Sequence, residues 1–146
     1  MIKNIMIATD GSETSEKAAK AGIDIARRSA GSVTVVYVMD IFRLAYLPGY
    51  TTLPGIKEQL LELMKKEGKE ATDFAAELAM KAGVPCNKIV AEGSPSEELL
   101  KISRESGMDL LVMGSVGRTG LDRFLLGSVA EKVVRNSTVP VLLIRE

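Results

Sequence analysis

The chain has 146 residues, with 19 basic and 19 acidic side chains, no net charge and no histidine. This length fits one domain, residues 1–146, which buries about 70% of the surface that its unfolded chain exposes. A neutral chain without histidine excludes Ser-His-Asp catalysis and histidine-ligated metals, and it argues against binding nucleic acid through bulk charge.

Short β-branched runs alternate with longer stretches of helical periodicity along the chain. Residues 2–9 predict a first strand that breaks at residues 10–12, and residues 15–30 predict a helix that Gly31 ends. Residues 32–39 are almost continuously apolar, which is typical of a strand covered on both faces.

Residues 40–55 form a long connection that contains Phe42, Tyr46 and Tyr50, half of the six aromatic residues of the chain. Connections of this length are often functional. Two interpretations stay open. Either the aromatic side chains fold back as a small satellite cluster, or the segment is a lid or a partner contact.

Helical periodicity returns over residues 56–82, and a short strand is predicted at residues 88–91. Ser94 is a predicted N-cap, because a proline occupies the first helical position and a glutamate follows where a capping box requires it. Residues 109–113 predict another buried strand, and residues 128–135 predict the last helix.

The last predicted strand runs from Val139 to Arg145 and completes an alternation of five strands with helices. This alternation predicts an α/β three-layer sandwich with a five-stranded parallel sheet in the order 3-2-1-4-5. Ligands of such Rossmann-like sheets bind beyond the carboxyl ends of the strands, where the winding reverses. Asp10, after the first strand, is therefore expected beside the loop that begins at Gly114, after the fourth.

The loop after the fourth strand is rich in glycine and leads into a helix at Ser128. Glycines let backbone amides approach an anion, and a helix start adds further amides. Arg118 and Arg123 supply positive charge nearby. The pattern predicts a polyphosphate site, although it is neither a Walker A loop nor a Rossmann fingerprint. The alternative that these are ordinary turn glycines stays open.

Three pieces of the sequence match the pattern of a known family. They are the first strand with residues 10–12, the turn at residues 93–95, and the block Gly114-x2-Gly117-x9-Gly127-Ser128. On these pieces the chain resembles the universal stress protein family over essentially its whole length. The last block is similar to the ATP-binding signature of that family. The resemblance implies the adenine nucleotide alpha hydrolase-like form of the Rossmann-like fold and membership of the ATP-binding branch.

The resemblance also implies roles for individual residues. Asp10 would contact the ribose, the backbone of Val38 would read the adenine, and Ala8 and Thr9 would flank the base. The expected binding residues in the second loop and the helix start are Met113, Gly114, Ser115, Gly117, Arg118, Gly127, Ser128 and Val129. The implied ligand is ATP or another adenine nucleotide, with Mg²⁺ near the phosphates. Asp10 keeps an alternative interpretation as a residue that only begins the first helix.

The second loop offers no evident catalytic base. The expected function is therefore an ATP-binding regulatory protein of the stress response, with an unidentified protein partner and at most slow ATP hydrolysis. Two alternatives stay open: an enzyme of the adenine nucleotide hydrolase type, and a chaperone-like structural dimer with a vestigial pocket.

The apolar strand from Val139 to Arg145 is expected at an edge of the sheet. A bare apolar edge promotes aggregation, so pairing with a second copy in a homodimer is the expected arrangement. Cover by another part of the same chain is the alternative.

The single cysteine, Cys86, excludes an intrachain disulfide and a cysteine-ligated metal cluster. A free thiol fits a reducing compartment. No stretch approaches the ~20 apolar residues that span a bilayer. We therefore expect a cytoplasmic protein that binds neither a membrane nor nucleic acid.

Overall fold

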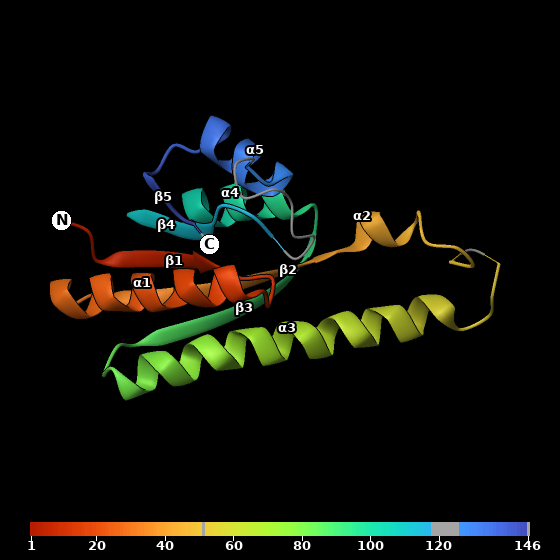
Figure 1. Ribbon diagram of the computed structural model, residues 1–146, viewed down its shortest axis with the longest axis horizontal. Coiled ribbons are helices and arrows are strands. Elements are labelled where there is room, and N and C mark those ends of the chain that lie inside the picture. The colour runs from red at the N-terminus through yellow and green to blue at the C-terminus, as the bar shows by residue number, and fades with distance from the viewer. Residues whose placement is uncertain (51, 118–125, 146) are drawn as a thin grey trace.

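Five parallel strands form the central layer of the computed structural model, which describes residues 1–50, 52–117 and 126–145 (Figure 1). The strands are β1 (Asn4–Ala8), β2 (Ser32–Asp40), β3 (Cys86–Gly93), β4 (Leu110–Gly114) and β5 (Val141–Ile144). The helices are α1 (Glu13–Ser29), α2 (Ile41–Leu44), α3 (Ile56–Lys81), α4 (Pro95–Glu105) and α5 (Ser128–Asn136). The strand order β3-β2-β1-β4-β5 confirms the predicted fold.

Helices cover both faces of this sheet, with α1 and α3 on one face and α4 and α5 on the other (Figure 1). Successive side chains of β1 point to opposite faces. Ile5 and Ile7 belong to the core cluster beneath α1 and α3, whereas Met6 belongs to the cluster beneath α4 and α5. All three are fully buried, which explains why the strand is almost continuously apolar. Within the described residues, no helix is both long and apolar enough to cross a membrane.

The edge strand β3 is longer than the sequence pattern predicts. It pairs with β2 from Cys86, opposite Val33, to Gly93, opposite Asp40. Several residues of β3 are polar and exposed, among them Lys88, so a search for apolar runs detects only part of the strand. Backbone pairing with β2, rather than burial of side chains, therefore defines this strand.

The helix ends also differ from the predicted ones. Ser12 is the N-cap of α1, and its hydroxyl accepts a hydrogen bond from Ser15 N. Ser94 is the N-cap of α4, as predicted, but its side chain makes no capping bond, so the predicted capping box does not form. At the end of α1, Ala30 rather than Gly31 adopts the left-handed conformation, with φ of 55°.

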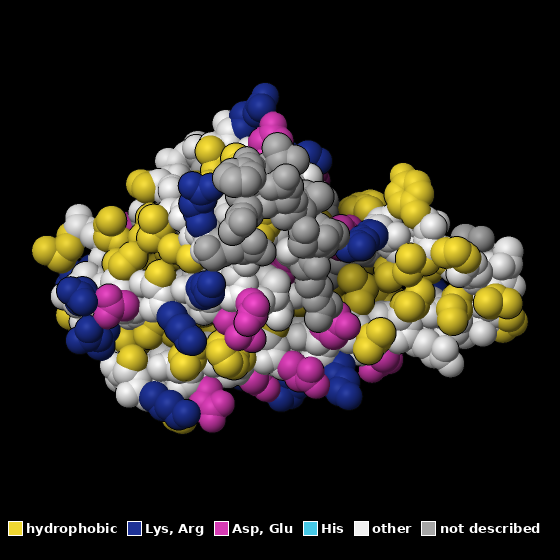
Figure 2. Space-filling model, in the orientation of Figure 1, with side chains coloured by type: hydrophobic (Ala, Val, Ile, Leu, Met, Phe, Trp, Pro, Cys, Tyr) yellow, Lys and Arg dark blue, Asp and Glu magenta, His cyan; other side chains and the backbone are white. Residues whose placement is uncertain are grey.

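The connection between β2 and α3 contains a helix that the sequence pattern does not predict, α2. Phe42 and Tyr46 are 62% and 88% exposed, so they do not form the satellite cluster. Figure 2 shows hydrophobic side chains gathered over the arm that α2 and the N-terminal part of α3 form. The interpretation of this segment as a lid or a partner contact stays a prediction.

Candidate functional site

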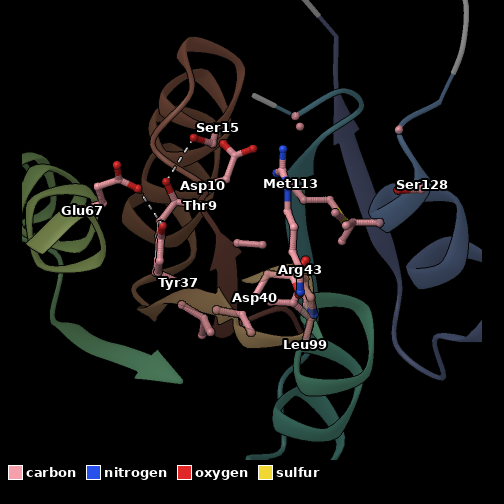
Figure 3. A pocket seen from close by; sticks show the side chains of 18 of the residues that line it. Thr9, Asp10, Ser15, Tyr37, Asp40, Arg43, Glu67, Leu99, Met113 and Ser128 are labelled. Carbon is pink, nitrogen blue, oxygen red and sulfur yellow. Dashed lines mark hydrogen bonds between the residues drawn. The ribbon is translucent and has the colours of Figure 1, made fainter. Parts of the chain in front are cut away.

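A cavity of about 630 Å³ lies beyond the carboxyl ends of β1, β2 and β4, at the point where the winding of the sheet reverses (Figure 3). Eleven of the twelve predicted binding residues line it: Ala8, Thr9, Asp10, Val38, Met113, Gly114, Ser115, Gly117, Gly127, Ser128 and Val129. The twelfth, Arg118, lies outside the described residues, as does Arg123. The fold therefore brings two distant segments of the sequence to one cavity.

The end of β2 contributes backbone groups to this cavity. Val33 N donates to Pro85 O next to β3, whereas Val36 O accepts from Thr9 N on the side of β1, at 2.9 Å in both cases. Alternate residues of a parallel strand hydrogen bond to the same neighbour. Val38 is the next residue that faces β1, and β1 ends opposite Val36. The N–H and C=O of Val38 therefore face the space beyond β1 without a strand to pair with.

Asp10 fixes the turn between β1 and α1. Its Oδ1 accepts a hydrogen bond from Ser12 N at 2.9 Å, which is the structural role that the alternative interpretation gave it. A Cβ on Gly117 would lie 2.9 Å from Asp10 Oδ2. The glycine loop thus lies directly against the carboxylate, and the predicted proximity of the two segments is confirmed. The Asp10 side chain therefore holds the turn before α1 and also faces the glycine loop after β4.

The hydroxyl groups of Thr9 and Ser15 also hold the turn between β1 and α1. Ser15 Oγ donates to Ser12 O at 2.8 Å, so in its 3.0 Å contact with Thr9 Oγ1 it must accept. Thr9 Oγ1 in turn accepts from Gly11 N at 3.2 Å. The proton of the Thr9 hydroxyl is therefore already donated within the protein. This network joins the end of β1 to the start of α1 at the wall of the cavity.

Packing requires one signature glycine, and the backbone amide of another closes the loop after β4. A Cβ on Gly114 would lie 2.7 Å from Cγ2 of Thr14, so the end of β4 can approach α1 only without a side chain. Gly127 N donates to Ser115 O at 2.8 Å, which closes the loop that follows β4. Packing therefore explains the glycine at position 114, whereas a Cβ on Gly127 would meet its neighbours at 3.4 Å or more. The Gly127 amide is already used within the protein.

Backbone amides that could bind a ligand lie at the start of α5. The first hydrogen bond of this helix runs from Glu131 N to Gly127 O at 2.9 Å, and Gly127 provides no side-chain cap. The amides of Ser128, Val129 and Ala130 precede that bond and lie at the positive end of the helix dipole. All three residues line the cavity. Among the described residues no side chain caps this helix start, and such a start is suited to binding an anion.

The structure adds lining residues that the sequence pattern did not single out. The hydroxyl of Tyr37 donates to Glu67 Oε2 at 3.4 Å, joining β2 to α3 across one wall. Asp40 accepts from Arg43 N at 3.1 Å and begins α2. Asp40 is the last residue of β2 and follows an apolar run in the sequence, so the rule that pointed to Asp10 also points to it. Arg43 and Glu67 carry no such signal, because only the packing of α2 and α3 brings them to the cavity.

The described lining residues include three carboxylates, from Asp10, Asp40 and Glu67, and one cation, Arg43. Leucine and methionine side chains of α2 and α3 give the far end of the cavity an apolar wall. No group of three or more Cys, Asp or Glu side chains in the described part of the chain is arranged to hold a metal ion. The cavity thus combines a polar end near β1, β4 and α5 with an apolar end near α2 and α3.

Comparisons with known proteins agree with this description. The universal stress protein family matches residues 1–145. A universal stress protein of Methanocaldococcus jannaschii, MJ0531, is 40% identical over 146 residues, covering 100% of this chain and 84% of the relative. The structure of MJ0577 superposes with a TM-score of 0.80 at 32% identity, covering 100% of this chain and 97% of that one. The chain belongs to the universal stress protein family.

Three more distant structures with this fold contain a nucleotide. One, from Archaeoglobus fulgidus, is a complex with dAMP, with a TM-score of 0.70, 22% identity and coverage of 99% and 98% of the two chains. One, from Arabidopsis thaliana, has AMP bound, with a TM-score of 0.70, 17% identity and coverage of 99% and 92%. A third is a complex with cAMP, with a TM-score of 0.63, 24% identity and coverage of 98% and 96%. At these identities the likeness shows the fold.

Proposed function

We propose that this protein binds ATP, or another adenine nucleotide, with Mg²⁺, and acts as a nucleotide-dependent regulator in a stress response. One observation carries the proposal. The free backbone edge of Val38, the carboxylate of Asp10 and the uncapped start of α5 converge on one cavity. These groups match in turn a base, a ribose and a phosphate chain.

The backbone of Val38 suits adenine in particular. Its C=O accepts a hydrogen bond from the amino group of adenine, and its N–H donates to the adjacent ring nitrogen. Guanine presents a carbonyl and an N–H at the corresponding atoms, so both of its contacts would be repulsive. A buried polar edge rejects a mispaired ligand strongly, because the unpaired groups lose their water.

The carboxylate of Asp10 accepts hydrogen bonds from ribose hydroxyls. The amides of Ser128, Val129 and Ala130 and the dipole of α5 bind phosphate oxygens. Mg²⁺ would be held mainly by phosphate oxygens and water, as is common for this ion, and Asp10 would be the carboxylate beside the loop. The relatives with bound dAMP, AMP and cAMP support adenine as the base in this proposal, since all three ligands share the adenine ring.

We propose slow hydrolysis at most, because the described carboxylates of the cavity, those of Asp10, Asp40 and Glu67, already accept hydrogen bonds from Ser12 N, Arg43 N and the Tyr37 hydroxyl. Steady-state turnover above roughly 1 s⁻¹, within the usual range of enzymes, would contradict this and favour the hydrolase alternative. A cavity that binds no nucleotide would favour the chaperone-like dimer. The cytoplasmic location stays a prediction.

We also propose that two copies pair through β5. This strand is at an edge of the sheet, and Leu142 is 36% exposed. Pro140 O accepts from Leu111 N, and Ile144 O accepts from Ser115 N, so the even-numbered residues face β4. The backbone groups of residues 141 and 143 therefore point to the open edge, where a second β5 can bind them.

Thermal unfolding with saturating nucleotide tests the proposed function. A ligand at 100 times its Kd stabilises the folded state by about 2.7 kcal/mol, which raises the midpoint by several degrees in a domain of this size. We expect this shift with Mg-ATP and none with Mg-GTP. No shift with ATP, or equal shifts with both, would contradict the proposal.

Two matched substitutions locate the binding site. Asp10→Asn keeps an oxygen for Ser12 N but removes the carboxylate, so we expect ATP affinity, measured by calorimetry, to fall about tenfold. Asp109→Asn makes the same chemical change outside the cavity and should leave ATP affinity unchanged. Equal losses in both variants would show that the effect is not local to the cavity.

A further inference from the structure

The cavity contains a cation that neither the family signature nor the sequence pattern assigns. We propose that Arg43, on α2, binds the phosphate chain of the nucleotide and sets the preference of the site for triphosphate over nucleoside. This inference rests on the proposed function and extends it from the base and ribose to the number of phosphates.

The backbone around Arg43 is well anchored. Asp40 is the N-cap of α2, and its Oδ1 accepts from Arg43 N at 3.1 Å. One residue further along, Leu44 is 4% exposed and packs into the protein. The residues on both sides of Arg43 therefore fix the direction in which its side chain leaves α2.

The Arg43 side chain lines the cavity and is also exposed to solvent. In Figure 3 the Arg43 side chain extends away from Asp40, and its nitrogen atoms lie at the end of the cavity where Asp10 and Ser128 are labelled. Arg43 and Ser128 line the same cavity. The guanidinium thus points towards the end where the start of α5 offers its amides.

The Arg43 guanidinium has no ion-pair partner within 4.0 Å among the described residues, although three carboxylates line the same cavity. It is also the one Lys or Arg among the described lining residues. Without the positive charge of Arg43, the three carboxylates that line the cavity would repel a polyphosphate. A planar guanidinium can bind two phosphate oxygens at once, and the interaction strengthens with the negative charge of the ligand.

Calorimetric titration with adenosine, AMP, ADP and ATP tests this assignment in wild type and Arg43→Gln. We expect wild-type affinity to rise with phosphate number. In the variant, ATP affinity should fall about tenfold, as for loss of one charge-assisted hydrogen bond, and adenosine affinity should not change. Arg43→Lys keeps the charge without the planar fork and should restore part of the ATP preference. Arg104→Gln makes the same charge change on the exposed surface of α4 and should alter neither ligand.

Equal losses for adenosine and ATP in Arg43→Gln would overturn the proposal, because they would indicate stacking on the base or a distorted cavity. Unchanged binding of every ligand would also overturn it. An unchanged unfolding midpoint of the ligand-free variant shows that it folds. Failure of the wild-type protein to bind any of the four ligands contradicts the nucleotide proposal itself and is seen before any variant is compared.

Discussion

Asp109 joins the starts of β1 and β4 through three hydrogen bonds. Its Oδ2 accepts from Asn4 N at 2.8 Å and from Lys3 N at 3.0 Å, while its own N–H donates to Asn4 O at 2.7 Å. The bonds from Asn4 and Lys3 hold the pKa of this carboxyl below its ordinary value of 3.8. Gly31 meets the same segment, because a Cβ there would lie 2.1 Å from Lys3 O. The sequence marks Gly31 as a helix stop, but the close approach to Lys3 is what requires glycine.

The lowered pKa of Asp109 predicts how its contribution to stability depends on pH. A carboxyl with a depressed pKa in the folded state stabilises the protein above its unfolded pKa, and this stabilisation is lost as the pH falls through the folded pKa. The unfolding free energy of Asp109→Asn should therefore be lower than that of wild type near neutral pH. The gap should close below pH 3.8. Urea denaturation across this range measures the gap, and a gap that does not change with pH would contradict the prediction.

Three helices begin in three different ways. The hydroxyl of Ser12 caps α1 by accepting from Ser15 N at 3.2 Å. Ser94 stands at the same position of α4 without a side-chain bond, and Gly127 has no side chain with which to cap α5. A serine before a helix predicts a cap in both of the first two cases, so the sequence alone does not distinguish them. The local backbone decides whether the hydroxyl reaches an amide.

The two serines provide a matched test of capping. Loss of an N-cap bond costs about 1 kcal/mol of stability. We expect Ser12→Ala to lower the unfolding free energy by about this amount, and Ser94→Ala to change it little. Urea denaturation of both variants at neutral pH gives the comparison. A loss in Ser94→Ala as large as that in Ser12→Ala would show that the observed bond is not the cause.

At the scale of the whole molecule, two exposed apolar regions are candidates for contact with a second copy. One is the edge strand β5, and the other is the arm on which Phe42, Tyr46 and Leu63 are exposed (Figure 2). Val141 is unsuitable for testing the edge, because its side chain packs on the core beneath α4 and α5. Leu142 is more exposed and lies at the middle of the strand.

Light scattering of two lysine variants separates these regions. Wild type should scatter as a particle of twice the 15.7 kDa chain mass. Leu142→Lys should give monomers, because an antiparallel pair of β5 strands centred there would bring two like charges together. Leu63→Lys, on the arm, should remain dimeric. A dimer of Leu142→Lys, or a monomer of Leu63→Lys, would exclude the edge as the interface.

The sequence by itself determined the order of the strands, the helices other than α2 and the two loops of the site, because periodicity, helix stops and glycine patterns are local properties of the chain. Tertiary structure decided which backbone groups and side chains meet. The free edge of Val38 depends on where the neighbouring strand ends. Arg43 and Glu67 reach the cavity through the packing of α2 and α3. Contacts between residues distant in sequence leave no local pattern, so they become visible only when the sheet and its helices are assembled.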